Sequence, residues 1–471
     1  MSTHTVSRIR KASVGTAAVV WGLSMMAVGS ARPAHAASER QPVLAYENVA
    51  GLMGTFSVNG AIDLRNPFFQ SLGTNGRTCL TCHAPDSAWT ITPQHAQLRF
   101  LETRGTDPLF TNNDGSVCEG AIARTVDEKR QAYRLLLTRG LIRIGMDVHA
   151  NAQFVIDSVR DPNRCGPASN DASLYRRPLP AANLRFLSAV MWDGRESTAT
   201  STIDQDLLHQ ANDATTGHAQ AARDLTPGEA RQIVDFEEGL FAAQMRDWIA
   251  GDLNANGASG GPLTLSAQPF FIGMNDPVGL NPTGAPFNSN VFTLFDPWLA
   301  RGERGAAADL RQAIARGEQI FNTKPITLSG VGGLNNFTFA SGVTVPDPFV
   351  GTCSTCHDTL SAGSHSVKAA LNIGVADPSI APYLPVYTLR NIATGETVTT
   401  TDPGRAMITG QWADIGKFKG PVLRALAARP PYFHNGSATT LGDVVDFYNT
   451  RFHIGFTPLE RAELIAFLNS L

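Results

Sequence analysis

Residues 77–86 read RTCLTCHAPD, and residues 352–358, far along the same chain, read TCSTCHD. The pattern Cys-x-x-Cys-His therefore occurs twice. In each copy the spacing puts both cysteine sulfurs at one edge of a single turn, and the histidine directs its imidazole to the space between them. This arrangement is typical of haem c attachment, in which each thiol adds to a porphyrin vinyl group and the histidine becomes an axial iron ligand.

Two other interpretations fit this motif less well. A zinc clip needs a fourth ligand at each copy, and a redox dithiol of the thioredoxin kind follows a strand and has no need of the histidine. Because both copies include the histidine, the sequence predicts two covalently bound haem c groups. The residues predicted to hold them are Cys79, Cys82, His83, Cys353, Cys356 and His357.

The N-terminus has the pattern of an export signal. A basic stretch ending SRIRK precedes an apolar run and then Ala34-His35-Ala36, a small-x-small cleavage site. We therefore expect a signal peptide over residues 1–36 and a periplasmic location, which agrees with the attachment of haem c after export. No other stretch approaches the ~20 apolar residues of a transmembrane helix, so we expect no membrane span in the mature chain.

Two of the six cysteines lie outside the motifs. In an oxidising compartment Cys118 and Cys165 are best interpreted as a disulfide. It would close a loop of roughly 47 residues and contribute ~3–4 kcal/mol in the chain-entropy model. Two free thiols are the alternative, because the sequence does not show that the cysteines are close in space.

Composition sets broad limits only. A chain of 471 residues with 43% hydrophobic residues is long enough for two or three domains with buried cores. A net charge of −3 gives no indication of a nucleic-acid partner.

An internal repeat indicates two similar units. Residues 226–240 read TPGEARQIVDFEEGL and residues 457–471 read TPLERAELIAFLNSL, each with threonine at the N-cap, proline next and glutamate closing a capping box. Each repeat follows a haem motif, as the last helix of a small cytochrome c domain does, and residues 307–322 are expected to form a helix that opens the second unit. We therefore predict a mainly α fold of two cytochrome c-like domains, residues 37–300 and 301–471, the first with a loop-rich insertion at about 95–180.

Two further segments resemble those of a known family. Residues 191–195, MWDGR, and residues 430–449, PPYFHNGSATTLGDVVDFYN, together with both motifs, resemble in order the signature segments of the bacterial dihaem cytochrome c peroxidase and MauG family. The resemblance implies that the His83 haem meets hydrogen peroxide and that the His357 haem stores or relays an electron. It also implies that Trp192 lies between the haems and carries a hole, against the alternative of a core tryptophan.

The resemblance also indicates the second ligand of the second haem. In this family that residue follows the histidine of the YFH segment, here His434, by fourteen positions, which is Tyr448. Peroxidases that accept electrons from small cytochromes have methionine there, whereas MauG has tyrosine; a thioether favours ferrous iron and a phenolate favours ferric and higher states. Tyr448 also ends an apolar helical stripe that begins at Leu441, so a core role is the alternative, and Met407 is the chief competing ligand.

On the peroxide side of the first haem this chain departs from the family. MauG-like proteins follow WDGR with a glutamine, a proline and a glutamate; here Gln210 aligns with the glutamine, Ala214 replaces the proline and His218 falls near the glutamate. We expect Gln210 and His218 to be catalytic, with His218 as a general acid–base or a blocking iron ligand. A solvent-facing helix histidine is the alternative for His218. Other distal candidates are Gln205, His209, His149 and His95.

The family also holds a calcium ion between its domains, partly through backbone carbonyls near the YFH segment. Pro431 matches one contributing position, whereas Arg429 stands where a threonine is expected. A calcium site near Pro431 is thus implied by the resemblance alone. His434 is expected to support a haem propionate or the contact between domains.

The resemblance implies a periplasmic dihaem enzyme that uses hydrogen peroxide to oxidise a protein or redox partner through high-valent haem iron, as MauG does. One alternative is a cytochrome c peroxidase that reduces peroxide with electrons from a small cytochrome. Another is a dihaem electron-transfer protein without catalysis. A related dihaem oxygenase fits less well, because its known members are considerably longer.

Overall fold

The computed structural model describes residues 43–471 apart from 166–170, 301 and 303. The predicted signal peptide and its cleavage site lie outside these residues. The described chain forms one compact unit. Helices account for 31% of the residues and strands for 16%, so the expectation of a mainly α fold is only partly confirmed.

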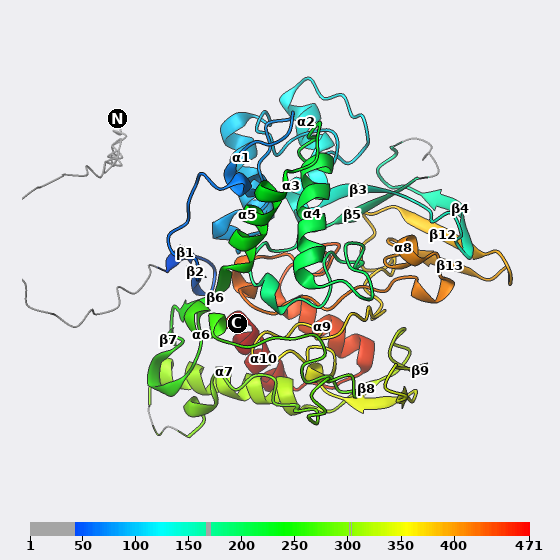
Figure 1. Ribbon diagram of the computed structural model, residues 1–471. Coiled ribbons are helices and arrows are strands. Elements are labelled where there is room, and N and C mark those ends of the chain that lie inside the picture. The colour runs from blue at the N-terminus through cyan, green and yellow to red at the C-terminus, as the bar shows by residue number, and fades with distance from the viewer. Residues whose placement is uncertain (1–42, 166–170, 301, 303) are drawn as a thin grey trace, which may run out of the picture. The chain divides into compact units, whose positions relative to one another are not determined.

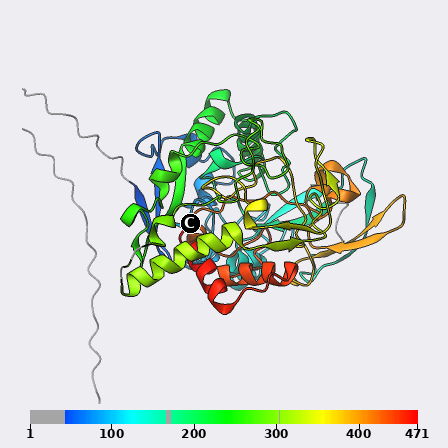
Figure 2. The ribbon, with the colours of Figure 1, turned by 90° about the horizontal axis from the view of Figure 1, so that it is seen from below.

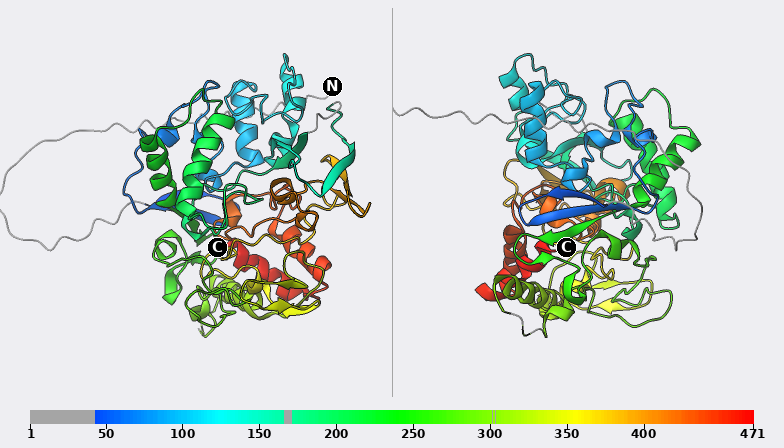
Figure 3. Two further views of the ribbon diagram at one scale, coloured as in Figure 1. Left: turned by 45° about the vertical axis from the view of Figure 1, so that its right-hand side comes forward. Right: turned by 90° about the vertical axis from the view of Figure 1, so that its left-hand side faces the viewer.

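An antiparallel sheet of four strands lies at the side of the molecule where the described chain begins (Figure 1). Its central pair joins segments far apart in the sequence, since Phe56 is opposite Phe241. The last residue extends this contact, because the backbone N–H of Gln244 donates to the Leu471 carbonyl, and Figure 3 shows the C-terminus beside these strands. The strands, in sheet order, are β1 (Leu44–Glu47), β2 (Gly51–Ser57), β6 (Leu240–Asp247) and β7 (Gly251–Asp252), with α6 (Pro262–Ser266) against them.

Around the first motif, helices pack into two apolar clusters. Helices α4 (Ile203–Gly217) and α5 (Pro227–Glu238) contact each other and share a core with Phe68 and Trp89. Helices α1 (Pro93–Thr103), α2 (Val126–Ala132) and α3 (Arg134–Arg139) lie beside them and build a second cluster around Phe100. The segment predicted as a loop-rich insertion therefore contains helices.

Around the second motif, α7 (Ala306–Thr323), α9 (Leu441–Phe452) and α10 (Pro458–Asn469) form the main core, and Figure 2 shows α7 running past the C-terminal helices. Gly317 permits this close crossing, because a Cβ there would lie 2.0 Å from the Glu463 carbonyl oxygen. The repeat prediction is confirmed at this level: α5 and α10 begin with the expected capping boxes, and α7 matches the helix predicted over 307–322.

Strands connect the insertion to the second half of the chain. Strand β4 (Phe154–Arg160) pairs with β12 (Val386–Asn391), so that Tyr387 is opposite Val159. The disulfide between Cys118 and Cys165 lies in the same insertion. The remaining elements are β3 (Ile142–Asp147), β5 (Asp171–Arg176), β8 (Ile326–Leu328), β9 (Phe337–Thr338), β10 (Thr344–Val345), β11 (Phe349–Gly351), β13 (Thr397–Thr400) and α8 (Ala406–Thr409).

The two halves of the sequence also exchange segments. Phe292, Phe295 and Trp298, which precede the boundary expected at residue 300, pack in the cluster formed by α7, α9 and α10. Ala425 and Ala428 in turn pack with α4 and α5. Within the described residues, no helix combines the length and apolar character needed to cross a membrane.

Candidate functional site

The two Cys-x-x-Cys-His motifs adopt the same local structure. Each forms a 3-10 turn, Cys79–Thr81 and Cys353–Thr355. In each, a threonine hydroxyl inside the turn accepts a 3.0 Å hydrogen bond from the backbone N–H of the threonine before the first cysteine. Because both turns are held by the same bonds, the cysteines and the histidine are displayed alike at two places in the fold.

The motif histidines are oriented by backbone carbonyls. His83 Nδ1 lies 3.0 Å from the carbonyl oxygen of Trp89, and His357 Nδ1 lies 2.7 Å from that of Gly363. A carbonyl oxygen only accepts, so each Nδ1 carries the proton and Nε2 is left to bind a metal. Burial lowers the pKa of His83 to about 4 and also lowers that of His357. Both imidazoles are therefore neutral, as a metal ligand must be.

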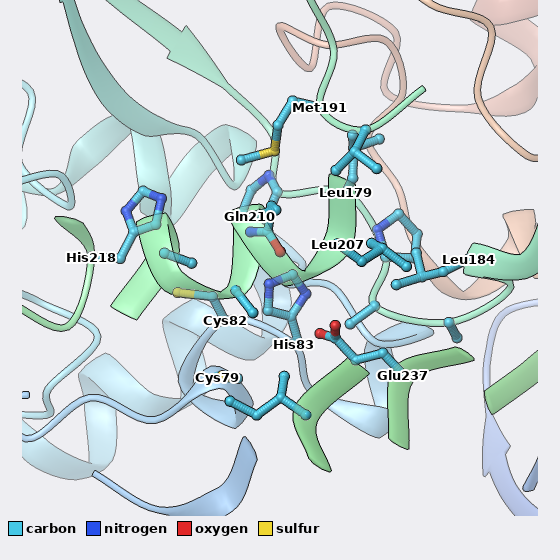
Figure 4. Close-up of a pocket in the computed structure, with 18 of the residues that line it drawn as sticks. Cys79, Cys82, His83, Leu179, Leu184, Met191, Leu207, Gln210, His218 and Glu237 are labelled. Carbon is cyan, nitrogen blue, oxygen red and sulfur yellow. The ribbon is translucent and has the colours of Figure 1, made fainter. Parts of the chain in front are cut away.

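The first motif opens into a cavity of about 170 Å³. Figure 4 shows Gln210, His218 and Met191 around His83, with Glu237 reaching into the space from α5. Apolar side chains such as Leu207 complete the wall. The cavity thus combines two thiols and a neutral imidazole with a wall whose surface is mostly apolar, which is the donor set for a covalently attached haem.

The second motif lines a separate cavity of about 200 Å³. Its walls come from α9, α10 and the YFH segment. Tyr448 lines it together with His357 and the thiols of the motif. His434 also lines it, buried and stacked on Phe418 at 4.0 Å between ring centroids. Neither ring nitrogen of His434 has a hydrogen-bond partner among the described residues, and Nε2 lies 3.8 Å from Asp402 Oδ2.

Trp192 lines both cavities. Its indole N–H donates a 2.8 Å hydrogen bond to the Arg177 carbonyl. The MWDGR turn around it is held by the buried carboxylate of Asp193, which pairs with Arg176 and Arg195. Gly194 has a φ of 70°, a conformation that glycine adopts without strain.

His218 and Gln210 both line the first cavity, as the resemblance implies. His218 is the C-cap residue of α4, and its side chain is 36% exposed. Its Nδ1 lies 2.6 Å from Asp114 Oδ2. Arg77 binds the other oxygen of Asp114 at 2.5 Å. Burial raises the pKa of Asp114, but the bonds from His218 and Arg77 outweigh this and lower it. The carboxylate is therefore charged and holds the proton of His218 on Nδ1.

The other distal candidates lie outside both cavities. The Gln205 side chain caps the N-terminus of α4, and His209 is 64% exposed and paired with Glu196. His95 faces Asp86, and His149 accepts from a neighbouring amide. The structure therefore brings Gln210 and His218, and none of these four, to the first motif.

Tyr448 projects from α9 into the second cavity. Burial raises the pKa of its phenol, with a smaller contribution from the neighbouring cysteine sulfurs. Met407, the competing ligand, instead packs in a separate apolar cluster with Phe154 and Ala406. The structure therefore places Tyr448, and not Met407, beside the second motif, where Tyr448 also packs against the apolar cluster that includes Phe452.

Among the residues of the first cavity that the sequence analysis did not assign a role are Met191 and Glu237. Met191 has a φ of 69°, an uncommon conformation for methionine, and its thioether faces the cavity (Figure 4). Glu237 is buried with Oε2 unpartnered, and burial raises its pKa to about 8. The one local signal for Glu237 was a carboxyl on the apolar face of α5, beside Val234 and Ile233.

Comparison with known proteins supports the resemblance to cytochrome c peroxidases. No family model matches the chain. It is 38% identical over 135 residues to cytochrome-c peroxidase IdrP2 of Denitromonas iodatirespirans, 26% of this chain and 36% of the relative. It is 37% identical over 81 residues to IdrP1 of the same organism, 15% and 22% of the two chains. It is 31% identical over 120 residues to cytochrome c551 peroxidase of Nitrosomonas europaea, 25% and 30% of the two chains.

These matches span well under half the length of each relative. Among solved structures, the chain aligns with a MauG-like protein associated with microbial copper homeostasis, covering 86% of both chains at 15% identity with a TM-score of 0.37.

Proposed function

We propose that this chain is a periplasmic dihaem c-type oxidoreductase of the peroxidase type, built from two cytochrome c-like units. The main support is that Trp192 lines two cavities that each contain a complete Cys-x-x-Cys-His motif. Such an arrangement suits a protein in which one site reacts and the other exchanges electrons with it. The names of the sequence relatives support the same class.

When bound, haem iron supplies the binding of peroxide and the one-electron redox chemistry. The chain's own residues prepare the two sites for it. His83 Nε2 would hold the haem iron, with the ring oriented by the contact of its Nδ1 with the Trp89 carbonyl. Gln210 and His218 line the same cavity, where the Gln210 side-chain amide would donate a hydrogen bond to peroxide and His218 Nε2 would accept and return its proton. Asp114 holds the His218 ring in the tautomer that this exchange needs.

We propose further that the enzyme is MauG-like and oxidises a protein partner. The support is Tyr448, because a phenolate ligand stabilises oxidised iron at the second site, where a thioether would stabilise the reduced form. Trp192 then shares the oxidising equivalent between the two sites. A cytochrome c peroxidase that takes electrons from a small cytochrome is the second candidate, favoured by the names of the relatives.

One experiment separates these functions. Haem content is measured first, and two covalent haems are expected, one lost in Cys79→Ala and the other in Cys353→Ala. Optical and EPR spectra are then recorded on the ferric protein before and after stoichiometric peroxide, without reductant. A change at both haems supports the MauG-like function. A reaction that begins only after one haem is reduced supports the cytochrome c peroxidase, and low-spin spectra that peroxide never alters indicate a simple electron carrier.

A further inference from the structure

Four cationic side chains converge where the two cavities meet. Arg177, Lys419 and Arg429 line both cavities, whereas Arg424 lines the first cavity. Arg177, Lys419 and Arg424 are buried, and Arg429 is partly buried. The three that line both cavities belong, with Trp192, to the wall that the cavities share, and Arg424 adjoins them through a hydrogen bond from Arg429 to its carbonyl. We call these four residues the cationic wall.

The positive charges of the cationic wall are not balanced within the described chain. Arg177 donates to the backbone carbonyls of Arg139, Ile91 and Arg429, and Arg429 donates to those of Arg424 and Val422. None of the four forms an ion pair with a carboxylate among the described residues. A carbonyl satisfies a donor but leaves the charge uncompensated.

Arg424 is the clearest case. Its Nη1 donates to the Ser361 carbonyl, but Nε and Nη2 are buried without any partner among the described residues. The acidic group that acts on it is Glu318, whose pKa burial raises to about 8. A carboxyl that is largely protonated at neutral pH gives Arg424 little compensation. These two nitrogens are therefore available to donate hydrogen bonds to an anion.

Burial without counter-charge is costly for these groups. It lowers the pKa of Lys419 to about 7, that of Arg177 to about 9 and those of Arg424 and Arg429 to about 10. Removing an ion from water costs several kcal/mol unless an opposite charge compensates. Four such costs at one place indicate that the functional protein brings negative charge to this wall.

We propose that the cationic wall is a carboxylate-binding site shared by the two cavities, which holds the propionate groups of both haems. This inference rests on the proposed dihaem function. Each haem carries two propionates, so two haems bring four carboxylates to four cations. Arginine binds carboxylates through paired N–H groups, and the free Nε and Nη2 of Arg424 are such a pair.

The cationic wall lies where the resemblance implies a calcium ion. Arg429 stands where threonine is expected, and its carbonyl oxygen accepts a 3.3 Å hydrogen bond from Arg177 Nη2. Calcium needs six to eight oxygen ligands, and a guanidinium here both uses one of those oxygens and repels the ion. The donor set near Pro431 therefore does not fit calcium, and fixed arginine charge replaces it between the sites.

The test measures the midpoint potential of each haem in the purified holoprotein by spectroelectrochemistry. Removing a cation beside a haem lowers its potential, because the ferric form carries more positive charge. Lys419→Met should lower both potentials, since Lys419 lines both cavities, and Arg424→Met should lower mainly that of the His83 haem. Lys417→Met is the matched control: Lys417 is equally buried, but it pairs with Asp414 and lines neither cavity.

Lys419→Arg keeps the charge and should restore both potentials. Equal shifts in the Lys419 and Lys417 variants, or no shift in the Lys419 and Arg424 variants, would overturn the proposal. Metal analysis of the unaltered protein needs no variant: after dialysis we expect no bound calcium and no spectral effect of a chelator, and one calcium per chain would contradict the proposal. Absence of covalent haem would instead refute the proposed function, which the haem assay detects separately.

Discussion

Trp192 donates its indole N–H to the carbonyl oxygen of Arg177 at 2.8 Å, and both residues line both cavities. The bond fixes the plane of the indole in the shared wall. The guanidinium of the same arginine belongs to the cationic wall. One contact thus links the predicted electron path to the predicted propionate site.

Trp192→Phe tests the path. It keeps an aromatic ring but removes the N–H donor and the more easily oxidised indole. We expect both haems to remain attached and electron transfer between them to slow by roughly tenfold or more, about 1.4 kcal/mol on the barrier. Stopped-flow spectroscopy after peroxide addition measures this rate. Trp298→Phe is the control, because Trp298 is buried outside both cavities; equal rates in the two variants would contradict the role of Trp192.

His218→Gln tests the proton exchange. The change removes the basic nitrogen from the first cavity and leaves a side chain of similar size. We expect the rate constant for the reaction with peroxide to fall by roughly 10²–10⁴-fold, as for other general acid–base residues, with haem content unchanged. His209→Gln, on the same helix but outside the cavity, should leave the rate unaltered. A His218 variant as fast as the unaltered protein would assign the proton exchange to another group, Glu237 first.

Local signals in the sequence predicted the parts of this structure that depend on neighbouring residues. The 3-10 turns of the motifs and the capped helices α5 and α10 follow from residues within a few positions of one another. The pairing of β2 with β6 could not be predicted in this way, because it joins segments about 190 residues apart. The glycines of β2 also give it a weak strand pattern.

The candidate site shows the same limit. Trp192 and Gln210 were found because the resemblance assigns roles to their positions. Nothing local in the sequence associates Arg177 with Lys419 and Arg424, which only the fold brings to one wall. Surface cations and buried unpaired cations look alike in a sequence, and burial alone distinguishes them.

Tyr448→Met tests the second ligand. A thioether in place of a phenolate favours ferrous iron, so the midpoint potential of the His357 haem should rise and that of the His83 haem should change little. The protein should also shift toward activity with a small cytochrome as electron donor. Spectroelectrochemistry checks the potentials. Met407→Leu serves as the control, and a potential that is unchanged by Tyr448→Met would remove Tyr448 as a ligand.

Glu318→Gln tests a buried carboxyl that lies outside both cavities. Its oxygens accept from the amides of Leu294 and Phe295, and burial raises its pKa from 4.5 to about 8. The folded state therefore holds the proton more tightly than the unfolded state. Its contribution to stability is fully present below pH 4.5 and is lost as pH rises through about 8.

Glutamine keeps an acceptor oxygen for the two amides but cannot ionise. We expect the free energy of unfolding of the unaltered protein to fall relative to Glu318→Gln by on the order of 3 kcal/mol between pH 5 and pH 9. Denaturant unfolding at a series of pH values measures the difference. Glu128→Gln, at an exposed helix cap, is the control. Backbone hydrogen bonds lower the pKa of Glu128, so the unaltered protein should not lose stability relative to Glu128→Gln as the pH rises. Parallel stability curves for Glu318→Gln and the unaltered protein would show that Glu318 is ionised in the fold.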